Sequence, residues 1–359
     1  MSTSSRGAAV TSGTTTLRQV AGDRLLIGAA VSPRAVEDPK LANVLAEQFN
    51  CLTGENAFKP DSLQRERGKF TFEEADKIAD FAAAHDMKMI GHTLLWHQQS
   101  PPWMFADENK RPLPREQALE NLKAHIDAVV KHFDGKIIGW DVVNEAISEN
   151  GNEYLRDTPA RRAIGDDYII KAFEFARAAS PDIQLYYNDY SIEVPGKREK
   201  AVRLIKELKA AGAHIDGVGI QGHWSLNFPE TKVVDDAINA FAALGVKVMI
   251  TELDVDVLPR KGGGGADISS TEKQGLDPYK NALPAEMQQK LARRYGELFK
   301  VFAKHRGTSL TRVTFWGFYD GGTWLDNWPV RGRTNHPLLW DRQLQPKPAL
   351  NAVIEALQK

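Results

Sequence analysis

Apolar residues recur along the chain in eight short runs that are rich in β-branched and aromatic residues and that alternate with amphipathic stretches. The runs predict strands at 25–31, 49–55, 88–96, 137–145, 184–190, 217–223, 247–254 and 312–318. Between them, apolar residues spaced three and four apart predict helices near 38–48, 73–85, 115–133, 167–179, 196–211, 231–244, 284–305 and 347–358.

Eight successive strand-then-helix units predict an α/β protein whose parallel sheet closes into a single (β/α)8 TIM barrel. A doubly wound open sheet is the alternative, but no Gly-rich fingerprint follows any predicted strand. No change in composition marks a second domain, so we expect one catalytic domain over 17–359. Residues 1–16 are small and polar and predict a disordered tail, and the run KGGGGAD (261–267) predicts a flexible surface loop.

Composition narrows the classes of partner. The hydrophobic fraction of 42% supports a substantial core, and 46 basic against 47 acidic residues leave a net charge of −1. Neither nucleic acid nor an anionic membrane is indicated as a partner, and no run approaches the roughly 20 apolar residues of a membrane span. Residues 1–16 lack the apolar segment of a signal peptide, so either a signal was removed or the protein is intracellular.

Polar side chains gather where the predicted strands end, which in a (β/α)8 barrel is the face that carries the active site. In chain order they are Glu55, Asn56, Lys59, His92, Trp96, His97, Asn144, Glu145, Asn188, Asp189, Tyr190, Gln221, His223, Glu252, Asp254, Trp316, Trp324 and Trp328. Glu145 and Glu252, on the fourth and seventh strands, should face each other across the barrel mouth. Such paired carboxyls perform retaining glycoside hydrolysis. A single acid at a strand end could equally cap a helix or pair with a lysine, but two acids among amides, histidines and tryptophans favour catalysis.

The spacing of these acids suggests their roles. Side chains two apart on a strand share a face, so Asp254 and Glu252 point the same way and His223 can lie between them. A chain Asp254–His223–Glu252 would orient Glu252 and favour its ionised form, which suits a nucleophile. Glu145 follows the apolar stretch 140–143, which should raise its pKa and suit a general acid/base.

Two alternatives concern neighbouring residues. His92 and His223 beside two glutamates could suggest a metal, but their spacing fits no short metal motif, so we expect neither metal nor cofactor. Trp316 and Trp324 are candidates for stacking on sugar rings, and the alternative is that they plug the top of the barrel.

Seven segments together resemble glycoside hydrolase family 10, the endo-β-1,4-xylanases. They are GENAFK (54–59), GHTLLWHQQSPPW (91–103), WDVVNEA (140–146), YYNDY (186–190), GIQGHW (219–224), ITELDV (250–255) and TFWGFYD with TWLDNW (314–328). The resemblance implies a single barrel that cleaves β-1,4-xylan with retention, with Glu145 as acid/base and Glu252 as nucleophile. It also implies a sugar-binding wall on the non-reducing side of the cut, formed by Glu55, Asn56, Lys59, His92, Trp96, Asn144, Gln221, His223, Trp316 and Trp324.

The resemblance further implies xylan and xylo-oligosaccharides as substrates and a monomer. It favours a secreted protein, with an intracellular enzyme acting on xylo-oligosaccharides as the alternative. Ser191 departs from the family's usual asparagine after YYNDY, which leaves the contacts on the leaving-group side open. Two other classes compete: a non-catalytic sugar-binding barrel, which should lack one glutamate, and a metabolic barrel enzyme, for which Lys59 could form a Schiff base.

Overall fold

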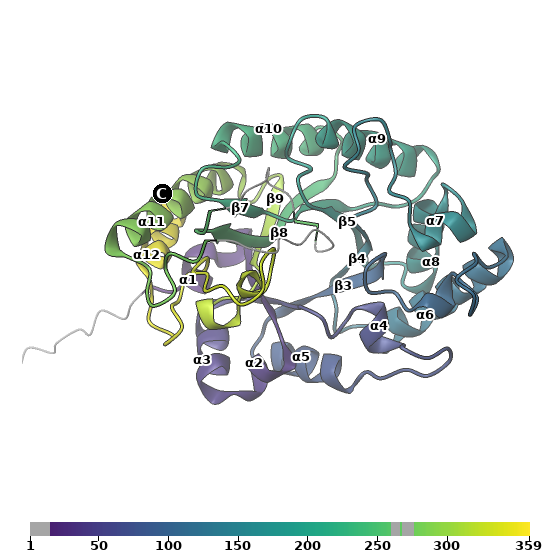
Figure 1. Cartoon of the computed structure of the whole chain (residues 1–359), viewed down its shortest axis with the longest axis horizontal. Helices are drawn as coiled ribbons and strands as arrows, with labels where there is room; N and C mark the ends of the chain where they lie inside the picture. Colours follow the sequence, from purple (N-terminus) through teal and green to yellow (C-terminus); the bar gives the residue numbers. More distant parts are fainter. Residues whose placement is uncertain (1–14, 260–265, 268–275) are drawn as a thin grey trace, which may run out of the picture.

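The computed structural model describes residues 15–259, 266–267 and 276–359. Eight parallel strands surround one axis in the order β6-β5-β4-β3-β2-β1-β9-β8, and pairing between β8 and β6 closes the barrel, which confirms the predicted fold (Figure 1). The strands are β1 Leu26–Val31, β2 Cys51–Gly54, β3 Lys88–Trp96, β4 Gly139–Asn144, β5 Gln184–Asp189, β6 Gly217–Ile220, β7 His223–Ser225, β8 Lys247–Asp256 and β9 Leu310–Phe315.

Helices form the outer layer around this barrel (Figure 1). Eight of them match the predicted amphipathic stretches: α3 Pro39–Gln48, α5 Glu73–Ala84, α6 Arg115–His132, α8 Tyr168–Ala179, α9 Lys197–Ala210, α10 Thr231–Ala242, α11 Ala285–His305 and α12 Pro348–Gln358. Four short helices were not predicted: α1 Leu17–Ala21, α2 Pro33–Glu37, α4 Pro60–Leu63 and α7 Pro159–Ile164. Three of these begin with proline, which is favourable in the first turn of a helix because its fixed φ suits that position.

The strands are buried on both faces, as their nearly continuous apolar sequences require. One large apolar cluster lies between the strands and the helices. A separate small cluster joins Cys51, Ile90, Tyr186 and Met249. Because these residues come from β2, β3, β5 and β8, which are not all neighbours in the sheet, their side chains meet across the barrel interior. Packing therefore fills the barrel and leaves the mouth to carry the chemistry.

The sixth predicted strand is divided in the structure. Gly222 has φ of +86°, a left-handed conformation that glycine adopts without steric cost, and it separates β6 from the short strand β7. β7 then pairs with the end of β8, so that His223 lies opposite Asp254. The break thus brings this histidine beside two acids at the mouth.

The first described residues belong to the fold. Thr16 is buried, and its side chain accepts a hydrogen bond from the backbone of Gln19 at the start of α1, although the sequence placed it in the tail; residues 1–14 lie outside the described part. Arg306 joins α1 to α12 by donating to the carbonyl oxygens of Val20 (3.0 Å) and Leu357 (2.9 Å). Within the described residues, no helix has the length and apolar character needed to cross a bilayer.

Candidate active site

Glu145 follows β4 directly and has φ of +58°, a strained conformation for a residue with a side chain. Its backbone N–H donates to the carbonyl oxygen of Asn188 (2.9 Å). The side chain is buried, and its two oxygens accept from Gln221 Nε2 (2.8 Å) and from Trp96 Nε1 (2.9 Å). The carboxyl group is therefore held on both sides at the mouth of the barrel.

The surroundings of Glu145 favour its protonated form. Burial and the charge of Asp189 raise its pKa to about 7, while the hydrogen bonds from Gln221 and Trp96 oppose the rise and the charge of Glu252 adds to it. A carboxylic acid that keeps its proton near neutral pH can serve as a general acid. The sequence predicts the apolar setting of Glu145 but not the contribution of Asp189 to its raised pKa.

Glu252, on β8, has the opposite environment. Burial alone would raise its pKa, but the hydrogen bond from His223 Nε2 (3.1 Å), the electrostatic effects of His92 and His223, and the hydrogen bond from Asn188 Nδ2 (2.7 Å) together lower it. Glu252 is therefore an anion at neutral pH. An ionised carboxylate opposite a protonated one is the arrangement that a nucleophile and an acid require.

His223 lowers the pKa of Glu252 and so helps to keep it ionised. Its Nδ1 lies 3.0 Å from Asp254 Oδ2. Burial disfavours a charged imidazole, but Asp254 and Glu252 outweigh it and raise the pKa of His223 to about 10. The imidazolium can thus donate to both acids, and the structure contains the chain Asp254–His223–Glu252 that the sequence suggested. Trp324 Nε1 also donates to Asp254 Oδ2 (2.8 Å).

Two amide side chains link the glutamates. Asn188 Nδ2 donates to Glu252 and to Asn144 Oδ1 (2.9 Å), and Asn144 Nδ2 donates to Glu145 Oε1 (3.2 Å). Asn188 needs Gly219 beside it, since a Cβ there would lie 2.3 Å from its amide oxygen. A glycine at position 219 therefore leaves the space that the Asn188 side chain occupies.

The two glutamates line a cavity of about 190 Å³. All ten residues of the predicted sugar-binding wall also line it: Glu55, Asn56, Lys59, His92, Trp96, Asn144, Gln221, His223, Trp316 and Trp324. Gln99 and Ala266 complete the lining and were not among the predicted residues. Asp254 is fully buried behind His223. A larger cavity of about 360 Å³ lies next to Trp96, but neither glutamate lines it.

Lys59 lies within this wall. Its Nζ donates to Asn56 Oδ1 (3.0 Å) and sits 4.6 Å from the centre of the Trp96 ring. Burial lowers the pKa of Lys59, and the charges of Glu252 and Glu55 counter that effect. Burial likewise raises the pKa of Glu55. The wall thus offers closely spaced donors and acceptors that suit sugar hydroxyls.

Tyr187 was not anticipated as part of the site. Its hydroxyl accepts from the backbone N–H groups of Ala146 (3.0 Å) and Ile147 (3.1 Å) and donates to Asp189 (2.5 Å). It therefore fixes the turn that follows Glu145.

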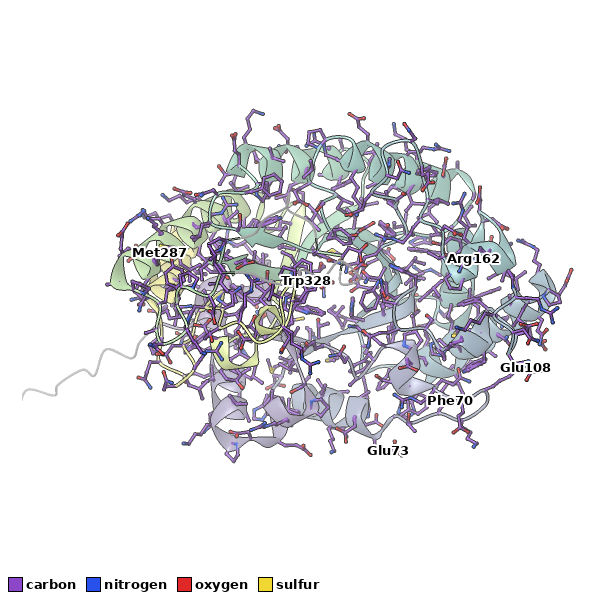
Figure 2. The ribbon with its side chains drawn as sticks, in the orientation of Figure 1. Phe70, Glu73, Glu108, Arg162, Met287 and Trp328 are labelled. Carbon is purple, nitrogen blue, oxygen red and sulfur yellow. The ribbon has the colours of Figure 1, made fainter. Side chains whose placement is uncertain are left out.

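Trp328 lies over the barrel near the centre of the view in Figure 2, whereas Glu73, Glu108 and Met287 lie at the periphery. Trp328 stacks on Trp324, with ring centres 4.7 Å apart.

In the described part of the chain, no group of three or more His, Cys, Asp or Glu side chains is arranged to hold a metal ion. A barrel mouth that combines a protonated carboxyl, an ionised carboxylate and a wall of amides and indoles defines a glycoside hydrolase. Comparison with known families supports this class, because residues 16–356 match the profile of glycosyl hydrolase family 10. The chain belongs to this family.

Individual relatives agree with that assignment. An endo-1,4-beta-xylanase A of Xylanibacter ruminicola is 43% identical over 353 residues, which cover 97% of this chain and 95% of the relative. An endo-1,4-beta-xylanase of Geobacillus stearothermophilus is 41% identical and covers 94% of this chain and 97% of its own. A solved GH10 endoxylanase from a sugarcane soil metagenome superimposes with a TM-score of 0.90 at 37% identity, over 94% of this chain and 99% of that one.

Proposed function

We propose that this enzyme cleaves internal β-1,4-xylosidic bonds of xylan and xylo-oligosaccharides with retention of anomeric configuration. Family membership and the xylanase activity named for its relatives support the substrate. A similar solved structure (TM-score 0.87, 37% identity, over 95% of this chain and all of that one) is in complex with xylotriose. The observation that carries the mechanism is that two glutamates line one cavity in surroundings that raise the pKa of Glu145 and lower the pKa of Glu252.

In the first step Glu145 donates its proton to the leaving oxygen while Glu252 attacks the anomeric carbon. The leaving sugar departs with that proton, and a covalent glycosyl-enzyme forms. The pair carries one negative charge before and after this step, since Glu145 becomes anionic as Glu252 becomes an ester. The buried site therefore does not have to accommodate an additional charge.

In the second step Glu145 accepts a proton from the water that releases the sugar. The charge of Glu252 contributes to the raised pKa of Glu145. Esterification removes that charge, so the pKa of Glu145 falls when a base is needed. Asn144, next to Glu145, is the residue we assign to the sugar 2-hydroxyl, where a hydrogen bond strengthens in the transition state.

The experiment follows the anomer first released from xylohexaose by proton NMR, together with reducing-sugar release from xylan and carboxymethylcellulose. The β-anomer should appear first, and xylan should be much the better substrate. Initial release of the α-anomer would exclude the covalent mechanism, and a preference for carboxymethylcellulose would exclude the substrate. Because polymeric xylan cannot cross a membrane, we also propose that the enzyme is secreted; an intracellular role on xylo-oligosaccharides is the alternative.

A further inference from the structure

A short described segment of the connection after β8 lies directly against the catalytic cavity. Ala266 is 4% exposed and lines the same cavity as Glu145 and Glu252. It belongs to an apolar cluster with Tyr190, Leu325 and Trp328. The sequence predicted a flexible surface loop over 261–267. Residues 261–265 lie outside the described part, and for Ala266 the prediction of a surface position is wrong.

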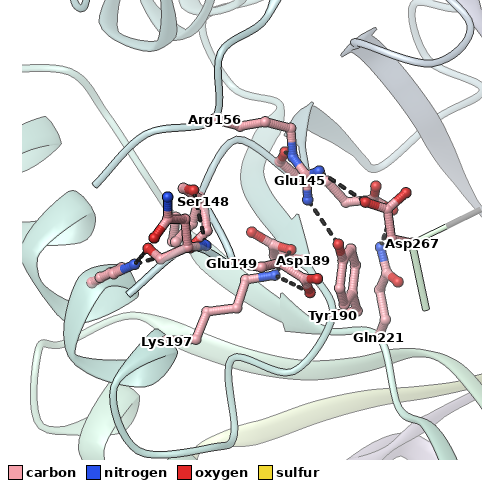
Figure 3. A network of polar contacts seen from close by, with 12 residues as sticks. Glu145, Ser148, Glu149, Arg156, Asp189, Tyr190, Lys197, Gln221 and Asp267 are labelled. Carbon is pink, nitrogen blue, oxygen red and sulfur yellow. Dashed lines mark hydrogen bonds and ion pairs between the residues drawn. The ribbon is translucent and has the colours of Figure 1, made fainter. Parts of the chain in front are cut away.

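Asp267 fixes this segment to the opposite side of the mouth through Arg156 (Figure 3). Arg156, in the connection after β4, donates to Asp267 Oδ2 (3.1 Å), to the Tyr190 hydroxyl (2.7 Å) and to the carbonyl oxygen of Glu145 (3.1 Å). The side chains of Arg156 and Asp267 are each 16% exposed. The ion pair is thus partly shielded from solvent and adjoins the acid/base residue.

The strand order shows where this ion pair lies. β4 and β8 are separated by β5 and β6, so a contact between their connections passes over the ends of those two strands. The predicted wall for the non-reducing side comes mainly from β3 and from the connections after β2 and β9. The ion pair is therefore on the leaving-group side of Glu145. Among the described residues that line the cavity, none comes from the connection after β5, and Tyr190 in that connection is only 1% exposed.

Tyr190 provides a rigid base for the pair. Lys197 Nζ lies 3.6 Å from the centre of the Tyr190 ring and 2.9 Å from Asp189 Oδ1. Asp189 in turn accepts from Tyr187, which fixes the turn after Glu145. Tyr190 and Arg156 are thus held by the barrel, and Asp267 is the member contributed by the connection after β8.

We propose that the Arg156–Asp267 ion pair determines specificity on the leaving-group side, because it occupies the space beside Glu145 that a leaving xylan chain needs. The inference rests on the proposed xylanase function. A leaving group of one atom fits without disturbing the pair. A leaving oligosaccharide must displace Asp267 before its first sugar can lie beside Glu145. The ion pair therefore lowers kcat/KM for substrates with a long leaving group more than kcat/KM for substrates with a small one.

The test compares kcat/KM for xylohexaose with kcat/KM for β-xylobiosyl fluoride, whose leaving group is a single fluoride ion. Asp267→Asn weakens the ion pair, and Asp267→Glu keeps its charge. Asp216→Asn is the matched control, because Asp216 pairs with Arg177 at 3.0 Å with similar exposure but lies where β6 begins, at the opposite end of the barrel. Hydrolysis of the fluoride also reports that each variant is folded.

Asp267→Asn should raise the ratio of the two constants roughly threefold to fivefold, the range expected from loss of a partly exposed ion pair. Asp267→Glu and Asp216→Asn should leave the ratio near that of the wild type. An unchanged ratio in Asp267→Asn would overturn the proposal, and a lower ratio would show that the pair binds the leaving group. If the wild type hydrolyses neither substrate, the proposed function is at fault and not the role of the pair.

Discussion

Replacing Glu145 by glutamine should remove a pH-dependent loss of stability, and the structure gives its size. The pKa of Glu145 is about 7 in the folded protein, against 4.5 for an ordinary glutamate. Below pH 4.5 the carboxyl is protonated in both the folded and the unfolded chain. Between pH 4.5 and 7 the unfolded chain releases this proton to become a hydrated carboxylate, while the folded chain still keeps it, so the rise in pH stabilises the unfolded chain alone. At about 1.36 kcal/mol per pH unit, this interval lowers the free energy of unfolding by about 3 kcal/mol.

Glutamine has no proton to lose, so Glu145→Gln should escape this decrease. The unfolding free energy of the variant minus that of the wild type should increase by about 3 kcal/mol between pH 4 and pH 8.5. Any constant cost of altered hydrogen bonds to Trp96 cancels in that comparison. Urea unfolding at pH 4, 6 and 8.5 measures the difference. Glu286→Gln, on the exposed surface of α11, is the control and should show little dependence on pH.

The same proton should appear in the kinetics. The alkaline limb of kcat/KM reports the acid in the free enzyme, and loss of the Glu145 proton should place that limb near pH 7. A stability difference that stays constant between pH 4 and 8.5 would refute the reasoning. So would an alkaline limb well above pH 9, because either result would mean that burial does not hold this proton.

Three further variants test the other members of the site. Glu252→Ala should lose nearly all activity on xylan and on aryl xylobiosides alike, because no covalent intermediate can form; substantial residual rates on either substrate would contradict this. Glu145→Ala should be severely impaired on xylan, yet should show a rapid burst of aryl release from activated aryl xylobiosides, whose departure needs no proton; absence of the burst would count against Glu145 as the acid. Trp324→Phe keeps an aromatic ring but removes the donor to Asp254, so kcat/KM should fall a few-fold, consistent with about 1 kcal/mol for one hydrogen bond. Trp324→Ala should also narrow the preference for xylose over glucose substrates. Equal effects of the two substitutions would show that only the hydrogen bond matters.

The barrel and the residues around its cavity follow from local patterns in the sequence. Each strand is an apolar run, and each polar group that ends a strand lies at the same face because all strands are parallel. The spacing of Glu252 and Asp254 on one strand was enough to suggest their shared histidine. These features depend on residues that are close together in the sequence, so the periodicity of a strand is enough to predict them.

Other contacts depend on segments that are distant in sequence and without a periodic pattern. Arg156 and Asp267 are 111 positions apart in the sequence, and neither lies in a helix or a strand. The turn at Gly222 places His223 on a separate strand and not on β6. A single glycine in an apolar run does not predict such a break. Asp189 was visible as an acid at a strand end, but its effect on the pKa of Glu145 depends on a distance that only the folded barrel defines.

The guanidinium of Arg306 holds the first and last helices of the described barrel together, since it bonds at once to Val20 and Leu357. Helices so close can be joined by a short linker. The barrel is therefore a suitable scaffold for circular permutation, with new termini opened in an exposed connection at the end of the barrel away from the catalytic mouth. The chain order of the eight units could then be changed while every strand keeps its neighbours.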